Sequence, residues 1–179
     1  MKKTAISFGL LSGLIIIVYS TAVFLLFGDF SKMSTSDITM VETLGYLRYL
    51  ILVLTIIFAI RYFKKQHGGL GSFKELFLAG LYTALVVALL VGLMELVYIL
   101  VNPGFFEQYG ELTTRKLVEE GASAEAIAKH KQSMDAYKWM ANPAAMGIWY
   151  FFETAIIGTI VSLIVALFAR TKNPRPALA

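Results

Sequence analysis

Three charged residues lie inside segments that are otherwise apolar: Arg48, Glu95 and Glu153. Ionisable groups are costly within a bilayer, and those that occur there usually face a protein interior, a water-filled cavity or one another. One guanidinium cannot compensate two ionised carboxylates, so a site built from these three residues would respond to protons or cations. Arg48, Glu95 and Glu153 are therefore the candidate intramembrane charge cluster of this chain.

The segments that carry these charges are typical of membrane-spanning helices. Hydrophobic residues make up 58% of the 179 residues, above the roughly 45–50% of soluble domains. About 20 mostly apolar residues cross the hydrocarbon core as a helix. The sequence therefore predicts an all-α fold, an integral membrane four-helix bundle in one domain over residues 1–179. Its predicted spans are residues 4–27, 43–63, 76–101 and 146–169.

The three charges are predicted to lie at a similar depth. Arg48 follows the start of its span at Thr43, Glu95 precedes the end of its span at Val101, and Glu153 follows Met146. With a rise of 1.5 Å per residue, these offsets correspond to roughly 7–11 Å below the same membrane boundary. Two interpretations remain open: a proton- or cation-responsive site, or a buried ion pair that sets helix register while the third charge reaches water. Because its side chain is long, Arg48 is the residue expected to reach water.

Small residues recur every four positions on two of the spans. The third span has Gly80, Ala84, Ala88 and Gly92, with Glu95 on the same face, and small residues let membrane helices approach closely. The fourth span repeats the pattern with Gly158, Ser162 and Ala166. These stripes are interpreted as packing faces, with homodimerisation through them as the alternative. The first interpretation also predicts that Glu95 points inward.

Residues 102–145 are predicted to form an extracytoplasmic helical hairpin between the third and fourth spans. Asn102-Pro103 resembles a helix start, Gly121 a helix stop and Ser123 the cap of a second helix. Asn142-Pro143 is expected to end that helix and lead into the fourth span.

Two further segments carry local signals. The polar stretch Gly28–Glu42 is predicted to be a loop. Trp139, Trp149 and Tyr150 are expected in an interfacial aromatic belt.

The distribution of Lys and Arg predicts the orientation, because short cytoplasmic connections carry their excess. Nine basic residues and one acidic residue, Glu75, fall on one side of the predicted spans: Lys2, Lys3, Arg61, Lys64, Lys65, Lys74, Arg170, Lys172 and Arg175. The other side has six basic and nine acidic residues. Both termini of this multi-pass chain are therefore predicted in the cytoplasm. The start Met1-Lys2-Lys3 resembles that of a bacterial secretory signal, but the uncharged run from Thr4 to Phe27 is too long for one, so we expect an uncleaved anchor in the bacterial inner membrane.

Several chemistries find no support in the sequence. There are no cysteines, so thiol catalysis and Cys-ligated metals are excluded. His67 and His130 fall on opposite sides of the predicted membrane, so we expect no metal and no cofactor. Gly68, Gly69 and Gly71 lack the pattern of a phosphate-binding loop. The sequence has no basic run with interleaved aromatics, so we do not expect it to bind a nucleic acid. No nucleophile and base lie at a useful spacing either, so the chain is not expected to be an enzyme.

The chain resembles the DUF4199 family of small multi-spanning membrane proteins, mostly of Bacteroidota. The resemblance is carried by the start Lys2-Lys3-Thr4-Ala5-Ile6, the basic turn that leads through Gly68-Gly69 to Ser72-Phe73-Lys74, Asn102-Pro103, the stretch Gly121–Ile127 and Asn142-Pro143. It covers nearly the whole chain and implies a four-helix inner-membrane protein. It implies no known activity and supplies no functional residues.

Two functions remain open from the sequence. The first is a non-enzymatic membrane protein that acts through its extracytoplasmic hairpin, on a protein partner or on the membrane surface, with the lipid bilayer as its other partner. The second is a small proton- or cation-coupled transporter that uses Arg48, Glu95 and Glu153. Because four helices enclose little space, the transporter would be expected to act as a dimer.

Overall fold

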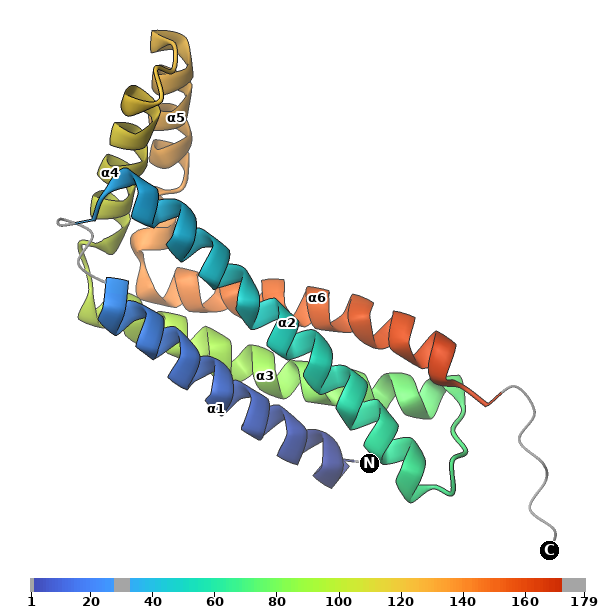
Figure 1. Ribbon diagram of the computed structural model, residues 1–179. Helices are drawn as coiled ribbons and strands as arrows, with labels where there is room; N and C mark the ends of the chain where they lie inside the picture. The colour runs from blue at the N-terminus through green and yellow to red at the C-terminus, as the bar shows by residue number, and fades with distance from the viewer. Residues whose placement is uncertain (1, 28–32, 172–179) are drawn as a thin grey trace, which may run out of the picture.

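A computed structural model describes residues 2–27 and 33–171, and this part of the chain contains helices and no strand. The helices in chain order are α1 (Lys2–Phe27), α2 (Thr35–Gln66), α3 (Phe73–Val101), α4 (Phe105–Glu119), α5 (Ala124–Ala136), the 3₁₀ turn η1 (Lys138–Ala141) and α6 (Pro143–Ala169). Figure 1 shows the four long helices α1, α2, α3 and α6 running side by side, with α4 and α5 projecting from one end.

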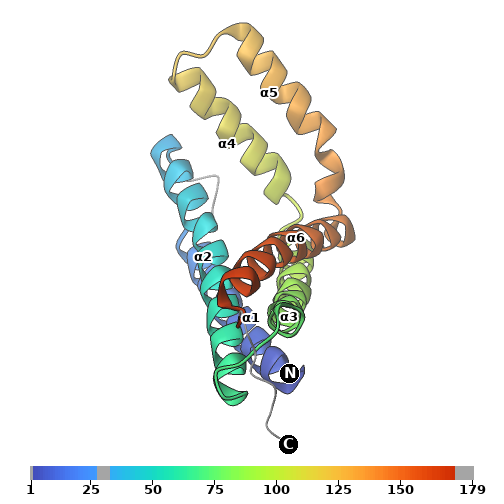
Figure 2. The same ribbon diagram turned by 90° about the vertical axis from the view of Figure 1, so that its right-hand side faces the viewer.

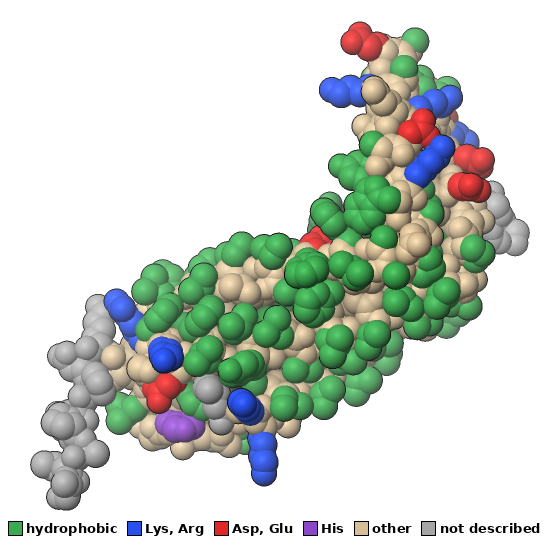
Figure 3. Space-filling view, turned by 180° about the vertical axis from the view of Figure 1, so that it is seen from behind, with side chains coloured by type: hydrophobic (Ala, Val, Ile, Leu, Met, Phe, Trp, Pro, Cys, Tyr) green, Lys and Arg blue, Asp and Glu red, His purple; other side chains and the backbone are tan. Residues whose placement is uncertain are grey.

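The four long helices are each long and apolar enough to cross a membrane. Their outward faces are apolar: Val18, Leu25 and Phe168, for example, are exposed, and Figure 3 shows hydrophobic side chains covering most of their length. Their inward faces meet in one apolar core that includes Ile16 of α1 and Ile56 of α2. A surface of this kind suits lipid and not water, so the chain is a membrane protein.

Helices α3 and α6 make the most extensive contact among the described elements, and small residues of both stripes take part in it. A Cβ atom on Gly92 would lie 2.7 Å from the carbonyl oxygen of Gly147, and one on Gly158 would lie 2.5 Å from Cβ of Ala84. The two stripes thus face each other within one chain, as their interpretation as packing faces requires. A homodimer through these same faces would have to displace this contact.

Helix α2 begins earlier than the sequence predicted. Residues 35–42 were expected in a loop, but they form the first two turns of α2, which Ser34 begins by donating its backbone N–H to Asp37 Oδ2 at 3.0 Å. The loop prediction is wrong here because these polar residues pack against another helix. Residues 28–32 of the predicted loop, like Lys172 and Arg175 of the charge count, lie outside the described residues.

The first two turns of α2 hold α4 by side-chain hydrogen bonds. Thr35 donates to Glu119 at 2.6 Å, Lys116 Nζ donates to the Thr39 hydroxyl at 2.8 Å, and the Tyr109 hydroxyl donates to Glu42 at 2.9 Å. A small apolar cluster of Met33, Ile38 and Leu112 lies beneath these bonds. Helix α4 is therefore fixed to α2, whereas α5 has no buried residue and lies beside α4 on the far side (Figure 2).

The helix caps agree with the sequence at Gly121 and Ser123, whereas α5 ends at Ala136, before the stop predicted at Asn142-Pro143. Gly121 has a φ of +72° after α4, the Ser123 hydroxyl accepts the N–H of Ala126, and Asn142 caps α6 with Pro143 in its first turn. Asn102, however, ends α3 instead of starting α4: its backbone N–H and its side-chain amide both donate to the Tyr98 carbonyl. The cap prediction for Asn102-Pro103 is wrong because Asn also satisfies carbonyls at a helix C-terminus.

Candidate functional site

Arg48, Glu95 and Glu153 come from α2, α3 and α6 and meet between them. Arg48 Nη1 donates to Glu95 Oε1 at 3.1 Å, and Arg48 Nη2 lies 3.6 Å from Glu153 Oε2. The side chains of Arg48, Glu95 and Glu153 are 17%, 12% and 30% exposed. The three charges therefore form one partly buried cluster, with one guanidinium shared between two carboxylates.

Two tyrosines complete the cluster. Arg48 Nη2 donates to the Tyr49 hydroxyl at 2.8 Å, and that hydroxyl donates to Glu153 Oε1 at 2.6 Å. The centroid of the Tyr150 ring lies 4.5 Å from the Arg48 guanidinium carbon, and that of the Tyr49 ring lies 4.8 Å away. A cation over an aromatic face is attracted by the ring quadrupole. Arg48 is thus held by both hydrogen bonds and ring contacts.

The expectation that Arg48 reaches water is wrong. Its guanidinium lies at the centre of the cluster and forms an ion pair with each of the two carboxylates. The most exposed of the three side chains is that of Glu153. Two carboxylates and two tyrosine rings together attract the guanidinium more strongly than the interface with water does, which explains the difference.

Two polar atoms of the cluster have no hydrogen-bond partner among the described residues. They are Arg48 Nε and Glu153 Oε2, and both are buried. Most buried polar atoms in proteins are hydrogen-bonded to protein or to water, and one without a partner costs free energy. Glu153 therefore has one oxygen bonded to Tyr49 and a second that can accept a proton or a donor.

The cluster lies in the wall of a cleft of about 940 Å³. The cleft is bounded by α1, α2 and α3, by Tyr150 and Glu153 of α6 and by Phe105 and Tyr109 of α4. Among the described residues, its charged lining consists of Arg48 and the three carboxylates Glu42, Glu95 and Glu153. Nine of its lining residues are aromatic: Tyr19, Tyr46, Tyr49, Tyr98, Tyr109, Tyr150, Phe24, Phe27 and Phe105.

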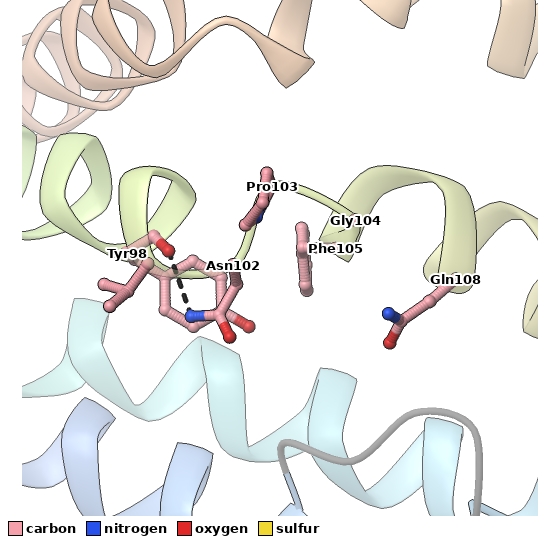
Figure 4. Close-up of a pocket in the computed structure, with 7 residues that line it drawn as sticks. Tyr98, Asn102, Pro103, Gly104, Phe105 and Gln108 are labelled. Carbon is pink, nitrogen blue, oxygen red and sulfur yellow. Dashed lines mark hydrogen bonds between the residues drawn. The ribbon is translucent and has the colours of Figure 1, made fainter.

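A smaller cavity of about 340 Å³ adjoins the cleft where α3 passes into α4 (Figure 4). Tyr98, Asn102 and Phe105 line both. The Asn102 amide is already used by the Tyr98 carbonyl, at 3.0 Å, as the dashed line in Figure 4 shows. No charged residue is among the described residues that line this cavity, so it is not a second charged site.

Tyr109 joins the rim of the cleft to α4. Its hydroxyl donates to Glu42, and burial together with this hydrogen bond raises the pKa of Tyr109 well above its ordinary value. Both causes favour the neutral phenol. The Tyr109 phenol therefore stays neutral at neutral pH and keeps the proton that it donates to Glu42.

The sequence did not identify Tyr49 and Tyr150 as part of the cluster. Tyr150 was expected only in an aromatic belt, yet it precedes Glu153 by three residues, a spacing that places both on one helical face. This signal could have linked it to the site. No such signal exists for Tyr49, since neighbouring residues on a helix point in different directions.

Comparison with known proteins identifies a family. A family model described as "Protein of unknown function (DUF4199)" matches residues 7–171, nearly the whole chain. Neither a curated protein nor a solved structure matches the sequence.

Proposed function

We propose a function on the premise that the chain belongs to the DUF4199 family, whose function is unknown. The proposal is a non-enzymatic, multi-pass protein of the bacterial inner membrane, a four-helix bundle that binds protons or cations at the cluster of Arg48, Glu95 and Glu153. Coupled transport of a small molecule through the adjoining cleft is its proposed activity. The geometry favours this function over the hairpin interaction, because it unites all three intramembrane charges at a cavity.

The charges at the two ends of the long helices support the orientation. The N-terminal end of α1, the α2–α3 connection and the C-terminal end of α6 lie at one end, and α4 and α5 lie at the other (Figure 1). The first end has seven described basic residues: Lys2, Lys3, Arg61, Lys64, Lys65, Lys74 and Arg170. We therefore assign this end, with both termini, to the cytoplasm and the α4–α5 hairpin to the extracytoplasmic side.

The observation that carries the proposal is the incomplete pairing of Glu153 Oε2, which has a long ion pair with Arg48 but no hydrogen bond in the described part of the chain. This oxygen lies 3.6 Å from Arg48 and belongs to the most exposed of the three side chains. A proton or cation bound to this oxygen would weaken the ion pair between Glu153 and Arg48. Arg48 would then pair with Glu95 alone. Binding of a proton or cation to Glu153 would thus change the ion pairs that link α2, α3 and α6, and a coupling site requires such a change.

Flux measurements in liposomes test this function. Full-length protein is reconstituted with a pH-sensitive dye inside the vesicles, and proton movement is followed after an imposed potential. Glu153→Gln keeps the Tyr49 hydrogen bond and removes the charge, so we expect it to abolish coupled flux. Glu111→Gln, an exposed position on α4, is the control with the same charge change. Equal flux in the wild type, Glu153→Gln and empty vesicles would reject the proposal.

A second function is favoured by one feature, the exposure of α5. No residue of α5 is buried, and its main contacts within the described part of the chain are with α4 and η1, so most of its surface is free to meet a protein partner on the extracytoplasmic side. Site-specific photocrosslinking in cells tests this idea. A crosslinker at Gln132 of α5 should trap one defined product, whereas one at lipid-facing Phe168 should not. No product at any exposed α5 position would contradict it.

A further inference from the structure

The charges that line the 940 Å³ cleft favour a cationic ligand. Three carboxylates, Glu42, Glu95 and Glu153, line the cleft with one guanidinium, and that guanidinium, of Arg48, is already bonded to Glu95 and Tyr49. The cleft therefore has an excess of negative charge in a region of low polarity, where charge interactions are screened least. An anionic lipid headgroup would be repelled from the same place.

The rest of the lining favours an organic cation over a metal ion. In the described residues no three His, Cys, Asp or Glu side chains come close enough together to hold a metal ion. Aliphatic side chains such as Ile17, Leu93 and Val97 line the cleft instead, with the nine aromatic residues named above. Aromatic faces bind organic ammonium groups, and aliphatic walls bury hydrocarbon.

We infer that the cleft binds an amphiphilic organic cation, with its cationic group beside Glu153 and Glu42 and its hydrocarbon part against Leu93 and Val97. The inference rests on the proposed coupling site and names its substrate class. In this arrangement the ligand and a proton compete for the negative charge of Glu153.

Gly45 offers a way to fill the cleft without changing its charges. It lines the cleft on α2, and a Cβ atom added there would meet nothing within 4 Å. A phenylalanine at this position would therefore extend into open space and occupy part of the cleft. Gly45→Ala adds only a methyl group and is the matched control.

Equilibrium binding of tetraphenylphosphonium tests the inference. The full-length protein is placed in nanodiscs of zwitterionic lipid, and binding to empty nanodiscs is subtracted. We expect saturable binding to the wild type, and loss of one nearby charge in Glu153→Gln or Glu42→Gln should weaken it at least about fivefold. Gly45→Phe should weaken it at least about tenfold, while Gly45→Ala and Glu111→Gln bind like the wild type. Tetraphenylborate, an anion of the same shape, should not compete.

Three results would overturn the inference. The first is wild-type affinity in both Glu153→Gln and Gly45→Phe, and the second is competition by tetraphenylborate. The third is a lack of saturable binding to the wild type, together with a co-purified lipid that is released in Gly45→Phe. The last result would identify a lipid acyl chain as the occupant. Melting temperature and gel-filtration elution show whether each variant is folded. If Gly45→Phe is not folded, binding to Glu153→Gln and Glu42→Gln alone decides the test.

The binding assay uses no gradient, so it separates this inference from the proposed transport. Tetraphenylphosphonium binding without proton flux in liposomes would retain the ligand class and reject coupling. Proton flux that depends on Glu153, without tetraphenylphosphonium binding, would retain the coupling site and reject the ligand class.

Discussion

The individual residues of the cluster have unequal importance for stability. Arg48 contacts both carboxylates and both tyrosine rings, whereas Glu95 and Glu153 each depend on Arg48 for a countercharge. Removing one partner from a buried ionic group leaves an uncompensated charge and costs more than removing the whole group. The cluster should therefore tolerate loss of one carboxylate better than loss of the arginine.

This asymmetry gives a prediction. Arg48→Met should lower the free energy of unfolding by about 3–5 kcal/mol, because it leaves two carboxylates facing each other without a cation. Glu95→Gln should cost less, since Arg48 then pairs with Glu153 alone. Thermal unfolding in detergent, followed by circular dichroism, measures both, with the exposed Arg61→Met as control. A cost for Glu95→Gln equal to or above that for Arg48→Met would refute the asymmetry.

Tyr109 gives a prediction on pH. Its pKa is raised in the folded protein by burial and by its hydrogen bond to Glu42, so its neutral form stabilises the fold. That contribution is present below the ordinary tyrosine pKa of about 10 and is lost as pH rises above it. Between pH 9 and 11 the wild type should therefore lose more stability than Tyr109→Phe does. Parallel pH profiles of the melting temperature would contradict this.

Among the elements, the contact of α3 with α6 depends on two glycines that touch across the helices. A Cβ on Gly92 would lie 2.7 Å from the carbonyl oxygen of Gly147, and one on Gly147 would lie 2.8 Å from that of Gly92. Backbone atoms on both sides prevent a small local adjustment. This contact also fixes the rotation of α3 and α6, and with it the approach of Glu95 and Glu153 to Arg48.

We predict opposite effects for two Gly→Ala changes. Gly92→Ala should destabilise the protein by about 1–3 kcal/mol, because it forces α3 and α6 apart. Gly45→Ala, in open space on α2, should stabilise it by about 0.5–1 kcal/mol through helix propensity. Thermal unfolding of both variants checks the pair. Equal effects of the same sign would show that the α3–α6 approach is not limiting.

At the scale of the whole molecule, the charges at the two ends of the long helices predict one orientation in the membrane. The basic end includes Lys65, in the last turn of α2, and the opposite end includes Ser123, which caps α5. Since the chain has no cysteine, a single introduced cysteine reports its own side of the membrane. The proposed topology can therefore be tested without changing native thiols.

We predict that Ser123→Cys reacts with a membrane-impermeant maleimide on intact spheroplasts and that Lys65→Cys reacts only after lysis. Both sites are exposed, so a difference in labelling reflects sidedness and not burial. Denatured samples provide the control for total reactivity. Labelling of Lys65→Cys from outside would reverse the assignment.

The sequence alone determined that the chain has four helices able to cross a membrane, and it located the helix stop at Gly121 and the cap at Ser123. These features depend on residues close together in the chain: a long apolar run makes a helix in lipid, and a cap acts within one turn. Counting residues along each span also predicted that Arg48, Glu95 and Glu153 share one level, and these three side chains do meet.

Only the tertiary structure decided which groups meet. Arg48 lies at the centre of the cluster, Tyr49 joins it to Glu153, and the first turns of α2 support α4. Each of these facts depends on how one helix is rotated and positioned against another, which contacts between distant segments determine. Spacing along a single helix shows which residues share a face of that helix, but not which helix packs against that face. For this reason the sequence identified the three charged residues of the site but not the contacts among them and the two tyrosines.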